Sequence, residues 1–222
     1  MTFAKPTQYV MTKFMYDHYK NEPLFVTFLT FGRILNSINY CRNTLVNIKP
    51  GNNKPSDIRA TQNYFFFMCG ILHEGIRELQ KNKILFKSFD TYKSKVAIYL
   101  KKVANFDKTI LGTIRDKAVF HLDNKDFYDS IQTLDLNEYE LITSTDKSYG
   151  ETYYILSDLI ALNILFMNMN INKNNELEFL DRLVSDLKTY SDEYVVIVSD
   201  IMKEAIDKMG WLSDNVQIVA KN

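Results

Sequence analysis

The sequence contains few of the residues that interrupt helices. Only 7 Gly and 4 Pro occur among its 222 residues. Because long stretches contain neither residue, the composition favours a mostly helical protein. Hydrophobic residues make up 46% of the chain and aromatic residues 14%. A chain of this length and composition can bury an ordinary core without disulfides or a structural metal.

Cysteine is also scarce, and its placement argues against both a disulfide-stabilised protein and a zinc protein. The two cysteines, Cys41 and Cys69, lie within apolar helical patterns and have no CxxC spacing. This placement favours buried, reduced thiols over a disulfide framework or a zinc site. The N-terminal segment lacks the continuous apolar region of a signal peptide. We therefore expect a cytoplasmic protein.

The chain has no excess charge of either sign, since 27 basic residues balance 27 acidic ones. The protein as a whole therefore does not attract nucleic acid, and any contact with RNA must be local. One segment is locally basic. Its lysines are Lys93, Lys95, Lys101, Lys102, Lys108 and Lys117. Such a segment could receive a phosphate backbone, although a solvated helix face is the commoner explanation.

The nearest approach to a membrane span is the segment Tyr153–Met169, and it is not continuously apolar. It contains Asp158 and Asn163. A carboxylate near the centre of a bilayer costs roughly 2.5–3.5 kcal/mol on insertion scales. We therefore predict a buried helix at this position and no contact with a membrane.

Apolar residues spaced by threes and fours predict a series of helices. Gly210 marks the end of the last one, and Asp90 or Thr91 is expected to cap the third. The segment Asn105-Phe-Asp107 is read as a break, and a second break is possible near Ser191-Asp192. The predicted helices cover about 23–48, 57–85, 91–103, 107–120, 127–134, 151–169 and 177–209.

This order of helices predicts an all-α protein with the architecture of an up-and-down helical bundle of four to six main helices. We expect a single domain over residues 22–210, with an irregular insert at 124–150. Residues 1–21 are predicted to form an N-terminal extension and residues 211–222 a C-terminal tail.

The most informative motif is Arg115-Asp-Lys-Ala-Val-Phe-His121, near the end of a predicted helix. Arginine is permanently charged and can grip a phosphate with its planar guanidinium. Histidine exchanges a proton near neutral pH. The chain has only 3 histidines. The presence of an arginine and one of these histidines in a single short motif suggests phosphodiester chemistry.

The motif resembles the signature of the HEPN superfamily, in which an Arg, usually followed by a polar residue, precedes a His by four to six intervening residues. Here Asp116 fills the polar place. The resemblance implies metal-independent cleavage of RNA, without a cofactor, in the manner of toxin-antitoxin or antiviral defence proteins. His121 would transfer a proton, Arg115 would hold the scissile phosphate and Asp116 would orient either group. Lys108 and Lys117 would contact the RNA.

Positions six apart on a straight helix differ by roughly 120° in direction and about 9 Å in rise, so Arg115 and His121 do not meet on one helix. In the family, two subunits bring their motifs together across a two-fold interface. The resemblance therefore implies a homodimer, and a toxin of this type would have an antitoxin protein as a partner.

The same residues also allow a reading without catalysis. His121 shares a helical stripe with Ile114 and Ala118, so it could be a half-buried structural histidine. Arg115 could pair with Asp116, Asp123 or a neighbouring helix. On this reading the chain is a helical-bundle binding or adaptor protein.

Two other features carry less weight. The sequence His73-Glu74-Gly-Ile-Arg77 imitates the start of an HExxH zinc motif, but Arg77 stands where the second ligand must be. Cys69 and His73 could touch at helical spacing, yet two ligands make a poor metal site, so no metal is expected. Glu74 and Arg77 are retained as possible supporting groups, because they lie on an otherwise apolar helix against which the motif helix could pack.

Overall fold

A computed structural model describes residues 7–47, 55–119, 124–134, 155–210 and 216–220. The described chain is helical apart from one short pair of strands, which confirms the all-α class. Its main elements are α1 (Lys13–Tyr19), α2 (Pro23–Asn47), α3 (Pro55–Lys81), α4 (Ala97–Phe106), α5 (Gly112–Ile114), α6 (Asn124–Thr133), α7 (Ile155–Asn168) and α8 (Glu176–Met209). The single-domain prediction for residues 22–210 stays a prediction.

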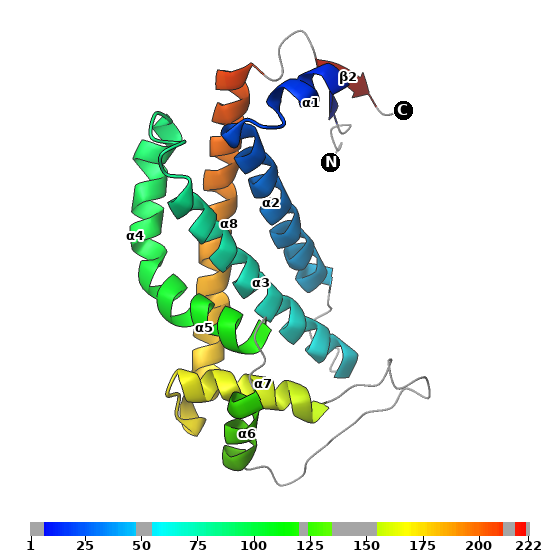
Figure 1. Ribbon diagram of the computed structural model, residues 1–222. Coiled ribbons are helices and arrows are strands. Elements are labelled where there is room, and N and C mark those ends of the chain that lie inside the picture. The colour runs from blue at the N-terminus through cyan, green and yellow to red at the C-terminus, as the bar shows by residue number, and fades with distance from the viewer. Residues whose placement is uncertain (1–6, 48–54, 120–123, 135–154, 211–215, 221–222) are drawn as a thin grey trace.

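The long helices form a bundle in which successive members alternate in direction. α2, α3, the helical segment that contains α4, and α8 run alternately down and up in Figure 1. α2 and α3 each begin at a proline, where the missing N–H has no helical partner to lose. The bundle is therefore built from the long amphipathic segments that the sequence predicted, with bounds within a few residues of the expected ones.

One long helix differs from the sequence prediction. Residues 90–119 form a single helix, here called the bulged helix, that includes three stretches of wider π turns. These are η1 (Tyr92–Val96), η2 (Asp107–Leu111) and η3 (Arg115–Val119). The predicted break at Asn105-Phe-Asp107 is wrong, because the chain accommodates these residues by widening the helix from Asp107 onward. Figure 1 shows the helix curving through α5.

The start of the bulged helix is capped from another helix. The carboxylate of Glu204, on α8, accepts hydrogen bonds from the backbone N–H of Asp90 at 2.9 Å and of Thr91 at 3.1 Å. Thr91 itself makes no side-chain cap. The predicted local cap by Asp90 or Thr91 is therefore replaced by a tertiary one, which also ties the bulged helix to α8.

α8 is continuous over its 34 residues, so the possible break at Ser191-Asp192 does not occur. Ser191 is buried and donates a hydrogen bond to the carbonyl of Lys188, while Asp192 pairs with Arg42 at 2.7 Å. Neither residue interrupts the helix, since Ser191 bonds within α8 and Asp192 forms its ion pair with α2. α8 ends at Gly210, whose φ of 61° is the left-handed conformation expected after a helix.

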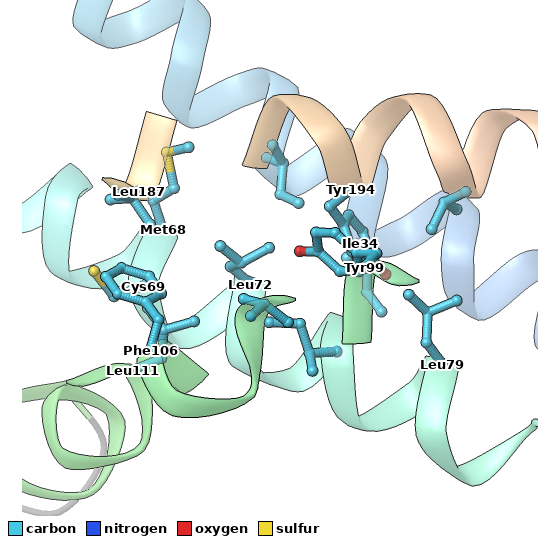
Figure 2. Close-up of a cluster of buried hydrophobic side chains, with 14 of the residues drawn as sticks. Ile34, Met68, Cys69, Leu72, Leu79, Tyr99, Phe106, Leu111, Leu187 and Tyr194 are labelled. Atoms are coloured by element: carbon cyan, nitrogen blue, oxygen red, sulfur yellow. The ribbon is translucent and has the colours of Figure 1, made fainter. Parts of the chain in front are cut away.

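The core lies where α2, α3, the bulged helix and α8 meet (Figure 2). Fully buried side chains from these elements include Phe31, Ile38, Leu72, Ile76, Leu79, Val103, Leu111, Ile114 and Val198. Both cysteines are buried and unpaired, as predicted. Burial raises the pKa of the Cys69 thiol far above its ordinary value, so this thiol is unreactive.

α6 and α7 close the lower end of the bundle in Figure 1. Asn163 of α7 donates a hydrogen bond to the buried hydroxyl of Ser130 in α6 at 2.9 Å. This contact accounts for a polar residue in an apolar helix. α6 starts at Asn124, earlier than the helix expected from residue 127, and residues 135–150 of the predicted insert lie outside the described chain. Among the described helices, none combines the length and apolar character needed to cross a bilayer.

At the opposite end, two short strands join the terminal regions. β1 (Thr7–Met11) pairs with β2 (Val216–Ala220) in antiparallel register, with Tyr9 opposite Ile218. These strands fall in segments that the sequence analysis treated as an extension and a tail, and it did not predict them.

We predict that Gly75→Ala destabilises the protein, because Gly75 faces a buried ring. A Cβ at this position would lie 2.6 Å from Cζ and from the hydroxyl oxygen of Tyr194, which is fully buried. The tyrosine cannot yield without disturbing the core, so we expect a loss of about 1–3 kcal/mol in unfolding free energy. Urea denaturation measures it.

Gly32→Ala is the matched control, since its added Cβ would meet only the terminal methyl of Met202, at 3.8 Å. Alanine is favoured over glycine within a helix by roughly 0.5–1 kcal/mol, so this variant should be as stable as the wild type or more stable. Equal effects of the two substitutions would contradict the proposed packing.

We also predict that the Glu204 cap contributes a stability that depends on pH. Burial alone would raise the pKa of Glu204, but hydrogen bonds from Lys208 and from the amides of Asp90 and Thr91 outweigh it and lower the pKa to about 2. The contribution is therefore present above the ordinary carboxyl pKa of about 4.3 and is lost as the pH falls toward 2. Glu204→Gln should cost about 1 kcal/mol at pH 7.

Urea denaturation at pH 7 and pH 3 tests this prediction. The difference in stability between wild type and Glu204→Gln should shrink at the lower pH. Asp181→Asn, at an exposed position of α8, is the control and should show no such trend. A constant difference at both pH values would exclude an ionised cap.

Candidate active site

Arg115 lies on the bulged helix, at the first residue of η3, and reaches toward α3. Its Nε is 2.7 Å from Oε1 of Glu74, and its Nη1 is 2.7 Å from Oδ1 of Asp116. The side chain is 26% exposed, although Nε itself is buried.

Two carboxylates and one other arginine lie around the Arg115 guanidinium. Asp116 and then Glu74 raise the pKa of Arg115 above its ordinary value. Arg77, one turn along α3, lies 3.6 Å from the same oxygen of Glu74. Counting Arg115 itself, the positive charges of the two arginines equal the negative charges of the two carboxylates. A phosphate must therefore compete with Asp116 and Glu74 to bind Arg115.

The structure places two of the three predicted catalytic residues together. Asp116 contacts Arg115 directly, and Glu74, which the sequence analysis retained as a possible supporting group, provides the second contact. His121 lies outside the described residues, as do residues 120–123 in general. Its predicted role therefore stays a prediction.

The interface between α3 and the bulged helix contains a second polar pair that the sequence analysis did not predict. Nδ1 of His73 lies 2.8 Å from Oδ1 of Asp107, and the two side chains are 14% and 11% exposed. A carboxylate only accepts hydrogen bonds, so Nδ1 carries the hydrogen and donates it. Nε2 is then the ring nitrogen left for other chemistry.

The wide turns of the bulged helix bring both polar pairs onto α3. Residues eight apart on a regular α-helix, such as Asp107 and Arg115, point about 80° away from each other. A π turn contains more residues than an α turn, so the π stretch that begins at Asp107 moves Arg115 back toward the same face. The two residues consequently contact adjacent positions of α3, His73 and Glu74.

The predicted substrate-binding lysines have different surroundings. Lys108 is exposed, whereas Lys117 lies 2.8 Å from Asp126 of α6. Farther along the bulged helix, Lys95 pairs with Asp200 at 2.7 Å and Lys102 pairs with Glu193. Acidic residues of α8 therefore neutralise part of the basic segment that the sequence suggested for RNA.

Two surface cavities lie away from Arg115. One, of about 550 Å³, is formed by α4 and α8 around Tyr99 and Ile197. The other, of about 590 Å³, lies between α7 and the start of α8 around Asn163 and Phe166. Within the described residues, no group of three or more His, Cys, Asp or Glu side chains is arranged to hold a metal ion.

Comparison with models of known protein families, with curated proteins and with solved structures finds no match for this chain. The functional argument therefore depends on the motif and on the geometry around Arg115.

His73 and Asp107 could have been singled out from the sequence by their position in apolar stripes. Asp107 lies four residues after Val103 and four before Leu111, both fully buried. His73 follows the buried Cys69 by four residues and precedes the buried Ile76 by three. A polar residue in each of two adjacent apolar stripes indicates a pair, because a lone buried charge is costly.

We predict that Glu74 and Arg115 stabilise the fold as a pair. The atoms that face each other, Oε1 and Nε, are both buried, so water screens their attraction less than it does at an open surface. A double-mutant cycle with Glu74→Gln and Arg115→Gln should give a coupling energy of about 1 kcal/mol.

The exposed pair of Asp17 and Lys20, 2.9 Å apart at the end of α1 with side chains 45% and 43% exposed, is the control for this cycle. Surface pairs of this kind typically contribute about 0.3–0.5 kcal/mol. If the coupling of Glu74 with Arg115 were no larger than that of the control, the contact would not hold the arginine in place.

Proposed function

We propose that this chain is a cytoplasmic, metal-independent endoribonuclease of the HEPN type that acts in antiviral defence or as a toxin with a protein antitoxin. The observation that supports this proposal most directly is the placement of Arg115. Two carboxylates on different helices orient its guanidinium, yet 26% of the side chain is exposed to solvent. A positioned arginine at an open surface can bind a phosphodiester.

The proposed chemistry follows from the residue types. Arg115 would bind the scissile phosphate and offset the charge that gathers on it in the transition state. Asp116 would hold the arginine until the substrate displaces it, which its exposed position allows. His121 would transfer a proton at the 2′-hydroxyl or at the leaving oxygen. The products would be a 2′,3′-cyclic phosphate and a 5′-hydroxyl.

The RNA-binding surface and the assembly are part of the same proposal. Lys108 is exposed on η2, one to two turns before Arg115, and would contact the backbone of the RNA. Lys117 would do so after exchanging Asp126 for a phosphate. The chain would act as a homodimer, as the resemblance to the HEPN superfamily implies.

A second candidate, a non-catalytic helical-bundle binding or adaptor protein, is favoured by the local charge balance. Arg115, Lys95, Lys102 and Lys117 all pair with carboxylates of the same chain. Paired charges of this kind stabilise a fold and attract RNA weakly. Catalysis separates the two candidates.

We predict that the purified protein cleaves RNA in the presence of EDTA and leaves 2′,3′-cyclic phosphate ends. Arg115→Gln and His121→Ala should each lower the cleavage rate by about 10²–10⁴-fold, the usual contribution of such groups. Product ends can be identified by mass spectrometry.

His18→Gln is the control variant. His18 is exposed on α1, near the end of the bundle opposite α6 and α7 (Figure 1), so this substitution should leave the rate unchanged. Equal cleavage by His121→Ala and the wild type would reject the assignment of His121. An inactive wild-type protein over a range of RNA substrates would favour the binding protein.

A further inference from the structure

Cleavage of RNA through the 2′-hydroxyl needs two proton transfers. The 2′-oxygen attacks phosphorus and loses its proton, the bond from phosphorus to the 5′-oxygen breaks, and that oxygen gains a proton. One imidazole can serve only one of these steps at a time. Within one chain, the function proposed above has His121 serve one of these steps or the other and names no second group.

We propose that His73, held by Asp107, is a second catalytic residue of the Arg115 site and acts as its general base. This inference rests on the proposed nuclease function. Nε2 of His73 would accept the proton of the 2′-hydroxyl while Arg115 holds the phosphate. His121 would then protonate the leaving 5′-oxygen, so that one proton is taken up and one released in each turnover.

The pairing with Asp107 suits His73 to this role. The carboxylate fixes the tautomer with hydrogen on Nδ1, as the 2.8 Å contact requires. It also stabilises the imidazolium that forms when Nε2 takes a proton, as the aspartate does in other carboxylate-histidine pairs. Both side chains are largely buried, so the ring cannot rotate away easily.

The position of His73 relative to Arg115 supports a shared site. Glu74, the next residue on α3, contacts Arg115. Gly112 lies one turn before Arg115 on the bulged helix, and a Cβ at Gly112 would be 3.7 Å from Cε1 of His73. Cε1 lies between the two ring nitrogens, so this edge of the imidazole contacts the bulged helix within one turn of the arginine.

The local geometry of the bulged helix also supports a shared site. Asp107 and Arg115 are the first residues of two separate π stretches. Such stretches are uncommon and occur frequently at functional sites. Here they place a carboxylate on His73 and a guanidinium on Glu74, the next residue of α3. An interface that served packing alone would need neither pair, since apolar residues would pack there without the free-energy cost of removing charged groups from water.

NMR of the imidazole groups of the full chain tests the placement without requiring any activity. Cytidine 3′-monophosphate serves as the probe, and His73 signals are assigned by comparison with His73→Gln. We expect the probe to shift the His73 signals, and Arg115→Gln to weaken its apparent affinity at least 10-fold. His18 should show no shift. If the probe leaves the His73 signals unchanged, the inference is wrong.

Cleavage assays test the catalytic role. His73→Gln keeps a donor for Asp107 and should fold, yet it should lower kcat at least 100-fold with little change in KM. Asp107→Asn should have a smaller effect in the same direction, and His18→Gln none. An active wild type with an equally active His73→Gln variant would overturn the role of His73.

The two assays distinguish the failure of this inference from failure of the proposed function. A wild type that cleaves no RNA rejects the nuclease function and with it the catalytic role of His73. The NMR titration still decides whether His73 and Arg115 share one phosphate-binding position.

Discussion

Two polar pairs cross an otherwise apolar interface between α3 and the bulged helix, and the packing of these helices depends on them. His73 meets Asp107 and Glu74 meets Arg115, each within 2.8 Å. An unpaired charge at such an interface is unfavourable, so the contacts favour the register of the two helices that joins both pairs. The π turns at Asp107 and Arg115 allow that register.

The same constraint underlies the chemistry that we propose for the site. The pairs hold an imidazole and a guanidinium on adjacent parts of one interface and restrict their rotation, which is what a preorganised phosphate site requires. Apolar packing of α3 and the bulged helix against α2 and α8 supplies the rigidity (Figure 2). A cap from Glu204 fixes the start of the bulged helix to α8, so the motif is carried by an element tied at more than one point.

The sequence predicted the long helices well because their signals are local. Apolar spacing defines α2, α3 and α8, and prolines and Gly210 mark several of their ends. It was wrong where tertiary contacts override local preference. Asn105-Phe-Asp107 looks like a stop signal, but Asp107 is satisfied by His73 of α3, 34 residues earlier. Ser191 likewise bonds within α8, and Asp192 forms an ion pair with Arg42 of α2.

The candidate site was predicted only in part, for the same reason. The motif identified Arg115 and Asp116, and the polar character of Glu74 on an apolar helix suggested a contact. The pair of His73 and Asp107 has no motif of its own, and only the packing of two helices brings it together. The lysines near the motif suggested an open basic surface, whereas Lys95 and Lys102 face acids of α8 that the local sequence does not reveal.

The central claim is that Arg115 and the imidazole of His73 face one phosphate position. A crystal structure of the protein with uridine vanadate, which imitates the five-coordinate phosphorus of RNA cleavage, tests it most directly. The account predicts vanadate oxygens within hydrogen-bond distance of both the Arg115 guanidinium and Nε2 of His73. Vanadate bound at another surface, with Arg115 still held by Glu74 and Asp116, would contradict it.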